Sequence, residues 1–341
     1  MPLKDAANQS AMLRSDERSW DVPSAMEVIV LAGGFGTRLR PWTEGKPKPL
    51  LPILDKSMIE HVVSVLPEYL VDRVLIAAGY GIEKMREHFS KASLPYEVVI
   101  VEETEPLGTG GAIANCKSHL SGGEFCVING DLITSLDVEG MLSFHKKNGG
   151  IATISLWEVE DPSRFGVADF DISTGKIKRF QEKPSREEAY SNLINAGMYV
   201  LEPEIFKLMP EGAHSIERDI FENLATTNGL NGFPFEGWFV DAGTPESFIE
   251  ASKVCVSSRK FESGEVIGDS WFDEGSTIAG EVSGSSIGAK VKIGDGSIVR
   301  DSVILEGAII GAGCNIERCL IGRGHNIPEN SNLADEIIGN G

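Results

Sequence analysis

The stretch that most constrains the fold is an apolar run that ends in a glycine-rich turn. Residues 28–32 read Val-Ile-Val-Leu-Ala, and Gly33, Gly34 and Gly36 follow directly. A β-branched apolar run of this kind predicts a buried strand of a parallel sheet. Glycine allows a positive φ and a close approach of the backbone to a ligand, so that N–H groups can face an anion. The pattern therefore predicts a strand, a tight turn and an anion-binding backbone.

Positive side chains follow this turn. Arg38, Arg40, Lys46 and Lys48 come next, separated by prolines that restrict the loop. The whole chain of 341 residues carries a net charge of −20, with 51 acidic and 31 basic residues. That charge argues against nucleic acid or an anionic membrane as the main partner, and a phosphate ligand must be held by local cations against it. A strand, a glycine turn and a cation cluster are typical of a polyphosphate site.

Two common phosphate-binding motifs do not fit this turn. A Walker A loop needs a Lys-Ser or Lys-Thr pair at a fixed distance after its first glycine, and none follows here. A dinucleotide fingerprint needs a third glycine, and Leu39 stands in that position. The sequence therefore excludes both motifs.

The next part of the chain alternates between helical and strand patterns. We expect helices over 57–66 and 83–89, and strands over 73–78 and 96–102. A further helix is expected to begin at Ala112. Such alternation predicts an α/β fold, a Rossmann-like mixed and mainly parallel sheet with helices on both faces. Ligands are then expected at the carboxyl ends of the strands, and no apolar run approaches the length of a membrane span.

The C-terminal part has a different period. Gly, Ala and Ser separate apolar residues that recur six positions apart, which predicts a short left-handed parallel β-helix of hexapeptide repeats. Irregular strands of a β-sandwich are the alternative. The two six-spaced series are Ile287, Ile293, Val299, Leu305 and Ile298, Ile304, Ile310, Ile316. We therefore divide the chain into a flexible N-terminal extension (1–25), an α/β domain (26–255) and a β-helix domain (256–341).

Two aspartates follow apolar runs. Asp131 closes the segment Phe125-Cys126-Val127-Ile128-Asn129-Gly130-Asp131, and Asp241 opens Asp241-Ala242-Gly243-Thr244-Pro245. An aspartate at a strand end can simply cap the next element. Mg²⁺ in phosphate chemistry is also held by one or two carboxylates together with phosphate oxygens. Both interpretations are open from the residues alone.

The string Gly-Gly-Phe-Gly-Thr-Arg-Leu-Arg-Pro over 33–41, with Lys-Pro-Leu-Leu-Pro over 48–52, closely resembles the signature of the sugar-1-phosphate nucleotidylyltransferases, or nucleotide-sugar pyrophosphorylases. The resemblance runs from about Met26 to Ser252. It implies attack by the phosphate oxygen of a sugar 1-phosphate on the α-phosphorus of an NTP, with release of pyrophosphate. It also implies Mg²⁺ as cofactor, with Asp131 and Asp241 as its ligands.

The same resemblance implies roles for other residues. Arg38 and Lys48 are the catalytic cations, at the leaving β,γ-phosphates and at the α-phosphorus. On the sugar side, Glu182 and Asn195 contact the sugar, Lys183 binds its phosphate, and Gly166 lines the pocket. From the residues alone, Glu182 and Lys183 also read as an ordinary surface ion pair. The implied nucleotide-binding residues are Leu31, Ala32, Gly33, Gly34, Gly36, Thr37, Arg38, Leu107, Gly108 and Thr109.

Three segments favour one branch of this family. The segments over 105–109, 195–199 and 215–221 look like those of the mannose-1-phosphate guanylyltransferases. The expected reaction is therefore that of GTP with mannose 1-phosphate to give GDP-mannose. A glucose-1-phosphate uridylyl- or thymidylyltransferase is the near alternative. A non-catalytic subunit that binds a nucleotide sugar is another, although such subunits typically lack an Arg, Lys or Asp of the set.

The cysteines and the repeats suggest a setting for the protein. The cysteines are scattered and include no C-x-x-C pair, so we expect neither a disulfide framework nor a zinc site. A reducing cytoplasm is the expected location. The β-helix is expected to join copies of the chain into a homo-oligomer, because a stacked coil leaves an exposed end. The cysteines are Cys116, Cys126, Cys255, Cys314 and Cys319.

Overall fold

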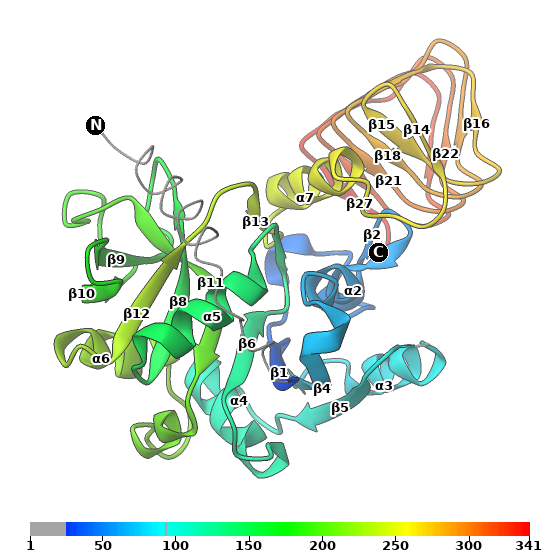
Figure 1. The fold of residues 1–341 in the computed structure, drawn as a ribbon. Helices are drawn as coiled ribbons and strands as arrows, with labels where there is room; N and C mark the ends of the chain where they lie inside the picture. The colour runs from blue at the N-terminus through cyan, green and yellow to red at the C-terminus, as the bar shows by residue number, and fades with distance from the viewer. Residues whose placement is uncertain (1–24, 93) are drawn as a thin grey trace.

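The computed structural model describes residues 25–92 and 94–341. The extension expected over 1–25 therefore lies, except for Ala25, outside the described residues. Figure 1 shows an α/β domain and a stack of coils, with helix α7 (Pro245–Ser257) between them. Across the described ranges, no helix has the length and apolar character needed to cross a membrane.

The α/β domain is built on a mixed sheet. Four neighbouring strands, β5, β4, β1 and β6, run parallel, and β11 runs antiparallel to β6. Their carboxyl ends therefore meet at one edge of the sheet. Among the described residues nine strands take part, in the order β5 (Glu97–Glu102), β4 (Val71–Ala78), β1 (Met26–Leu31), β6 (Phe125–Asn129), β11 (Leu193–Leu201), β8 (Ala152–Glu158), β12 (Leu230–Pro234), β10 (Lys176–Glu182) and β9 (Gly166–Asp171).

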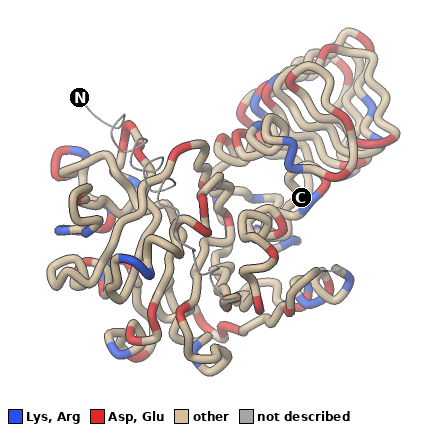
Figure 2. The backbone as a smooth tube through the Cα atoms, viewed as in Figure 1, with Lys and Arg blue, Asp and Glu red and all other residues tan. Residues whose placement is uncertain are grey.

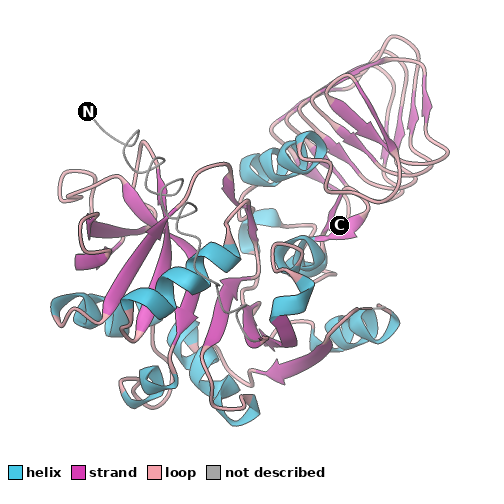
Figure 3. Ribbon diagram, in the orientation of Figure 1, coloured by secondary structure: helices cyan, strands magenta, loops and turns pink. Residues whose placement is uncertain are grey.

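Helices cover both faces of this sheet (Figure 3). Val28 and Val30 of β1 pack on one face with helices α2, α3 and α5, whereas Ile29 packs on the other with α4 and α6. The alternation along β1 thus places a separate apolar core on each side. The helices are α2 (Met58–Val63), α3 (Ile82–Lys91), α4 (Gly108–Cys116), α5 (Val138–Asn148) and α6 (Glu222–Thr226), with the π-helix η6 (Ile216–Phe221) before α6.

The predicted elements are present with shifted ends. The helix expected over 57–66 is α2, which begins after Ser57 because that residue forms a capping box with Glu60. The helix expected from Ala112 begins earlier, at Gly108. Shorter elements complete the domain: η1 (Thr37–Leu39), η2 (Lys48–Leu50), β2 (Pro52–Ile53), β3 (Lys56–Ser57), η3 (Glu68–Leu70), η4 (Lys117–His119), β7 (Leu132–Thr134), η5 (Pro203–Lys207) and β13 (Phe239–Asp241).

The C-terminal strands form three parallel ladders that fit a left-handed β-helix. One ladder is β15-β18-β21-β24-β27, with the hairpin strand β14 at its end, and the others are β16-β19-β22-β25 and β17-β20-β23-β26. The strands are β14 (Glu265–Ile267), β15 (Ser270–Phe272), β16 (Thr277–Ile278), β17 (Glu281–Ser283), β18 (Ser286–Ile287), β19 (Lys292–Ile293), β20 (Ile298–Arg300), β21 (Val303–Ile304), β22 (Ile309–Ile310), β23 (Asn315–Glu317), β24 (Leu320–Ile321), β25 (Asn326–Ile327), β26 (Asn332–Ala334) and β27 (Ile337–Ile338).

The hexapeptide repeats predicted from the sequence are present, but one step in each of these coils is five residues rather than six. Ile298 pairs with Asn315 and Val303 with Leu320, so a coil in this region repeats after 17 residues. In these coils one side is a residue shorter than the other two, which breaks both predicted series. Leu305 accordingly packs outside the coil. The residues buried inside are Ile287, Ile293, Val299, Ile304, Ile310, Ile316, Ile321 and Ile327.

A third apolar core joins the β-helix to the loop that follows the glycine turn. Trp42 lies in this loop, is 1% exposed, and packs edge-on against Phe248 of α7 with 5.7 Å between ring centroids. Its Nε1–H donates to the Ile338 carbonyl at 3.2 Å, in the last coil. The same core contains Leu39 from the loop and Leu320 from the coil. The β-helix therefore supports the loop that carries Arg38 and Lys48.

We expect Trp42→Ala to lower the free energy of unfolding by about 3–5 kcal/mol, because it empties a fully buried site and removes a hydrogen bond. Trp42→Phe fills more of the space and should cost less. Urea unfolding followed by circular dichroism gives both values. Tyr69, an exposed aromatic residue, provides the control as Tyr69→Ala. A Trp42→Ala protein as stable as the control would show that this core does not couple the two domains.

Candidate active site

The glycine turn brings two cation-bearing segments close together. Gly36 has a φ of 61°, and a Cβ placed on it would lie 2.9 Å from Lys48 Cβ and 2.9 Å from Thr43 Cγ2. Only glycine therefore allows η1, with Arg38, to pack against η2, with Lys48. Gly34 differs, because nothing lies within 4 Å of a Cβ placed on it. Its backbone faces open space.

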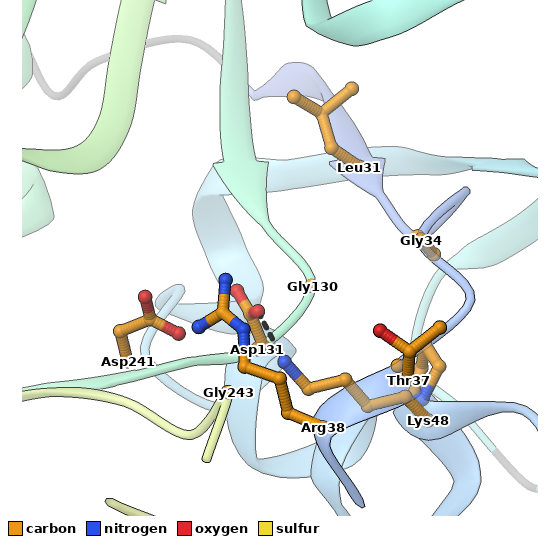
Figure 4. Close-up of a pocket in the computed structure, with 12 residues that line it drawn as sticks. Leu31, Gly34, Thr37, Arg38, Lys48, Gly130, Asp131, Asp241 and Gly243 are labelled. Atoms are coloured by element: carbon orange, nitrogen blue, oxygen red, sulfur yellow. Dashed lines mark hydrogen bonds and ion pairs between the residues drawn. The ribbon is translucent and has the colours of Figure 1, made fainter. Parts of the chain in front are cut away.

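An open cavity of about 220 Å³ lies at the carboxyl ends of β1 and β6 (Figure 4). It collects side chains from the turn, from η2, from the β6–β7 connection and from the end of β13. These segments are far apart in the sequence, and the sheet edge brings them together. The lining residues are Leu31, Ala32, Gly34, Gly36, Thr37, Arg38, Lys48, Pro49, Gly130, Asp131, Asp241 and Gly243.

One ion pair lies in this cavity. Lys48 Nζ is 2.5 Å from Asp131 Oδ2, and Lys48 is only 9% exposed. Asp131 reaches this position because β6 passes close to β1 at its end: the Gly130 N–H donates to the Leu31 carbonyl at 2.9 Å. A Cβ on Gly130 would lie 2.7 Å from that carbonyl oxygen, so the residue before Asp131 must be glycine.

Asp241 approaches the same point from β13. The Ala242 N–H donates to the Asp131 carbonyl at 2.9 Å, which ties the two aspartate segments together. Burial raises the pKa of Asp241 to about 6, and the negative charge of Asp131 adds to the rise. The opposing charges of Lys48 and Arg38 do not cancel it. A Cβ placed on Gly243 would lie 2.9 Å from Asp241 Oδ1, 3.5 Å from Lys48 Nζ and 3.7 Å from Arg38 Nη1. These three side chains therefore lie close to one another around Gly243.

The two aspartates fit a divalent cation. Among the described residues, Asp241 Oδ1 is buried and accepts no hydrogen bond. A buried carboxylate oxygen without a donor is unfavourable unless a cation or proton comes to it. Two carboxylates beside a phosphate-sized cavity are the donor set that Mg²⁺ takes together with phosphate oxygens. Asp131 and Asp241 are thus the residues here that would hold the metal.

The residues expected to bind the sugar lie together, but they do not line the cavity. Glu182 ends β10 opposite Gly166 of β9, and a Cβ on Gly166 would lie 2.8 Å from Glu182 Oε2. Lys183 Nζ is 3.2 Å from Glu182 Oε1. Asn195 of β11 donates from Nδ2 to the Tyr199 hydroxyl at 2.9 Å. Burial raises the pKa of Glu182, and the charge of Glu217 adds to this.

The segment at the start of α4 has an internal reason for its glycines. A Cβ on Gly108, which has a φ of 70°, would lie 2.6 Å from the His214 carbonyl oxygen, and Gly110 N–H donates to that oxygen at 3.0 Å. The segment before η6 therefore packs directly on this turn. Thr109 also faces it and donates to Glu217 Oε2 at 2.6 Å. Close packing within the chain, as well as ligand approach, requires small residues here.

Sequence patterns did not single out every residue of the site. Gly130 and Gly243 belong to the same motifs as Asp131 and Asp241, the predicted metal ligands. Their positions beside these aspartates could therefore have identified them as residues of the site. Pro49 lies within the Lys-Pro-Leu-Leu-Pro string. Glu103 also approaches the turn, because a Cβ on Gly33 would lie 2.8 Å from its Oε1. It stands in a run of acidic residues that offers no local signal.

Comparison with known protein families agrees with this geometry. Residues 27–258 match the family described as nucleotidyl transferase. The chain belongs to the nucleotidyl transferase family. Residues 251–336 match a second family, described as the GlmU-like C-terminal hexapeptide, which agrees with the ladders of the β-helix.

Relatives of this nucleotidyl transferase include two named for one activity. Mannose-1-phosphate guanylyltransferase 1 of Arabidopsis thaliana is 37% identical over 292 residues, which cover 82% of this chain and 80% of that protein. The mannose-1-phosphate guanylyltransferase catalytic subunit beta of Dictyostelium discoideum is 36% identical over 245 residues, which cover 71% of this chain and 68% of that protein.

Solved structures resemble the catalytic domain. UDP-glucose pyrophosphorylase in complex with UDP-glucose superposes with a TM-score of 0.62 at 26% identity, covering 70% of this chain and 100% of that one. HddC from Yersinia pseudotuberculosis in complex with GMP-PN gives a TM-score of 0.57 at 29% identity, covering 67% of this chain and 98% of that one.

The contrast between Gly36 and Gly34 gives a test of the turn. Gly36→Ala puts a side chain at positive φ against Lys48, so we expect a loss of about 1–3 kcal/mol in unfolding free energy and a displaced Lys48. Gly34→Ala has space and should unfold like the wild type, while its methyl group blocks ligand approach. Chemical denaturation measures the first effect and nucleotide titration the second. Equal stabilities of the two variants would contradict this account of the turn.

Proposed function

We propose that this chain is a mannose-1-phosphate guanylyltransferase, which transfers the GMP group of GTP to mannose 1-phosphate and releases pyrophosphate. The observation that carries the proposal is the convergence of Arg38, Lys48, Asp131 and Asp241 on one cavity beside a glycine turn. The relatives named mannose-1-phosphate guanylyltransferase support the choice of base and sugar.

The reaction is a displacement at phosphorus. A phosphate oxygen of the sugar 1-phosphate forms a bond to the α-phosphorus, and the bond from that phosphorus to the bridging oxygen of pyrophosphate breaks. The nucleophile is already an anion, so the chain need not supply a general base. Catalysis of this kind rests on orientation and on neutralisation of charge.

The cations of the cavity supply that neutralisation. Arg38 binds the β- and γ-phosphates, because a guanidinium presents paired donors to phosphate oxygens. Lys48 exchanges its contact with Asp131 for the oxygens at the α-phosphorus, where charge develops. The backbone at Gly33, Gly34 and Gly36 donates N–H groups to the triphosphate. Leu31, Ala32 and Thr37 complete this nucleotide side, together with Leu107, Gly108 and Thr109.

Asp131 and Asp241 hold Mg²⁺ in this proposal. When bound, the ion supplies charge neutralisation between the two phosphorylated substrates. Asp241 contributes the buried oxygen that has no donor among the described residues. Burial and the charge of Asp131 raise the pKa of Asp241, and the charges of Lys48 and Arg38 oppose that rise.

The sugar half of the site lies across β6 from the nucleotide half. Lys183 binds the phosphate of the sugar, since its side chain is 56% exposed and its ammonium group is a compact donor with rotatable N–H bonds. Glu182 and Asn195 accept or donate hydrogen bonds to the hydroxyl groups, and Gly166 leaves room beside them. A non-catalytic role is not favoured, because the Arg, Lys and Asp set is complete.

We also assign the protein to the cytoplasm and expect a homo-oligomer formed through the β-helix. The five cysteines are all buried free thiols, which suits a reducing compartment. The acidic surface, spread over both domains (Figure 2), supports small phosphorylated substrates as partners rather than nucleic acid.

Pyrophosphate release across a panel of nucleoside triphosphates and sugar 1-phosphates tests the proposal. We expect the highest kcat/KM for GTP with mannose 1-phosphate, and loss of turnover when a chelator removes Mg²⁺. Restoring Mg²⁺ should restore the rate. Higher kcat/KM for UTP or dTTP with glucose 1-phosphate would assign the chain to the alternative activity, and no turnover with any pair would contradict an enzyme.

The roles of Arg38 and Lys48 make a second prediction. Arg38→Ala and Lys48→Ala should each lower kcat by about a hundredfold or more, because each removes a charge that stabilises the transition state. Arg40→Ala is the matched control, since Arg40 is an exposed cation of the same loop that does not line the cavity. Steady-state kinetics on folded variants decide the matter. Near wild-type turnover by either cavity variant would remove that residue from the mechanism.

A further inference from the structure

A cluster of metal-binding side chains lies away from the active site, at the opposite end of the sheet. Asp131 follows the carboxyl end of β6, whereas Glu124 precedes the start of the same strand. Phe125 of β6 pairs with Leu201 of the antiparallel strand β11. Glu124 and Glu202 are the next residues beyond that pair, so the register places two carboxylates across from each other.

His145 of helix α5 joins these two carboxylates. One atom from each of the three side chains, an imidazole nitrogen and two carboxylate oxygens, lies within 4.8 Å of the other two. His145 is 1% exposed, and its Nε2 is 3.3 Å from Glu202 Oε1. The carboxylate side chains are partly covered, at 18% exposed for Glu124 and 35% for Glu202. Three possible metal ligands from three elements therefore meet at a sheltered place in the fold.

The other nitrogen of the imidazole has a partner outside the cluster. His145 Nδ1 lies 2.6 Å from the Thr153 hydroxyl oxygen, which also accepts from Asn231 Nδ2 at 3.1 Å. A hydroxyl oxygen has two lone pairs and can accept both donors. Burial lowers the pKa of His145, although the charge of Glu202 opposes this. In the neutral tautomer that donates from Nδ1, as metal-bound histidines commonly do, the Nε2 lone pair faces a carboxylate and needs a cation between them.

The charges around the cluster also favour a cation. Lys146 Nζ is 2.9 Å from Glu124 Oε1, and its side chain is 42% exposed. Among the residues that the structure describes, no lysine or arginine pairs with Glu202. Like charges across from each other on paired strands are destabilising, and one lysine offsets only one of the two carboxylates. A divalent cation between them would offset the charge that Lys146 leaves.

We propose that Glu124, His145 and Glu202 form a binding site for one Zn²⁺ ion, which fastens helix α5 to strands β6 and β11. One imidazole nitrogen and two carboxylate oxygens supply three protein ligands, and water completes the four positions that Zn²⁺ takes. The imidazole distinguishes this site from Asp131 and Asp241, whose oxygens suit Mg²⁺. Its ligands include no thiolate, so the scattered cysteines do not bear on it. The site lies at the far end of β6 from the reaction and does not rest on the proposed function.

Zinc uptake by the full chain tests this inference. The protein is freed of metal with a chelator and dialysed against buffered Zn²⁺ in the presence of millimolar Mg²⁺, which competes at Asp131 and Asp241. Mass spectrometry then gives the zinc bound per chain. We expect one Zn²⁺, and a melting temperature raised by about 5 °C once free Zn²⁺ exceeds the Kd about a hundredfold. Glu124→Gln and Glu202→Gln should each weaken binding by about a hundredfold or more, because each removes a ligand.

Two further variants serve as controls. Glu204→Gln matches Glu202→Gln, because Glu204 is exposed and pairs with Lys207 at 3.7 Å outside the cluster. It should take up Zn²⁺ as the wild type does. Lys146→Gln should bind Zn²⁺ about twofold to fivefold more tightly, since it removes the cation that competes for Glu124. The glutamate variants decide the matter because their side chains are partly exposed, and melting curves recorded without metal show that they are folded.

The inference holds if the wild type and Glu204→Gln take up one Zn²⁺ and both variants of the cluster glutamates lose it. It is overturned if the wild type takes up no Zn²⁺ in the presence of Mg²⁺, or if Glu124→Gln or Glu202→Gln retains wild-type uptake. None of these measurements needs turnover. A chain that transfers no nucleotide to any sugar 1-phosphate would contradict the proposed function and leave this test intact.

Discussion

The contact between Lys48 and Asp131 organises the whole cavity. Two carboxylates, Asp131 and Asp241, lie at one sheet edge of a strongly acidic chain, and burial together with the charge of Asp131 raises the pKa of Asp241. A half-buried ion pair gains little net energy, because desolvation of both charges opposes their attraction. The role of this ion pair is to fix the position of the Lys48 side chain. Lys48 is held beside the carboxylates, in the wall of the cavity.

That position depends on apolar packing far from the charges. Lys48 stands in η2, which touches η1 only because Gly36 has no side chain. The same loop is fixed at Trp42 by α7 and by the last coil of the β-helix. A loop held on both sides loses less conformational freedom when it binds a ligand. The β-helix thus takes part in the cavity indirectly, besides any role in joining copies of the chain.

Local patterns in the sequence were enough to predict the sheet, its helices and the group of residues around the glycine turn. Strand alternation and the carboxyl-end rule predicted that ligands bind at one edge of the sheet, whereas the grouping of Arg38, Lys48, Asp131 and Asp241 into one site was implied by the family resemblance. Contacts between distant segments were beyond such patterns: Trp42 and Ile338 are 296 positions apart. The 17-residue coil was also hidden, because three members of each six-spaced series do lie inside the coils: Ile287, Ile293 and Val299 in one, and Ile304, Ile310 and Ile316 in the other.

The two halves of the site are joined by a chain of side-chain hydrogen bonds. Asn195 donates to the Tyr199 hydroxyl, which donates to Glu217 Oε1 at 3.3 Å, and Thr109 donates to Glu217 Oε2 at 2.6 Å. Glu217 belongs to the π-helix η6, a rare geometry that is frequent at functional sites. Because one carboxylate receives donors from both sides, the spacing between the α4 turn and β11 is set before a ligand arrives. Lys183, on the sugar side, is instead exposed and contacts Glu182, so its side chain has room to adjust to the second substrate.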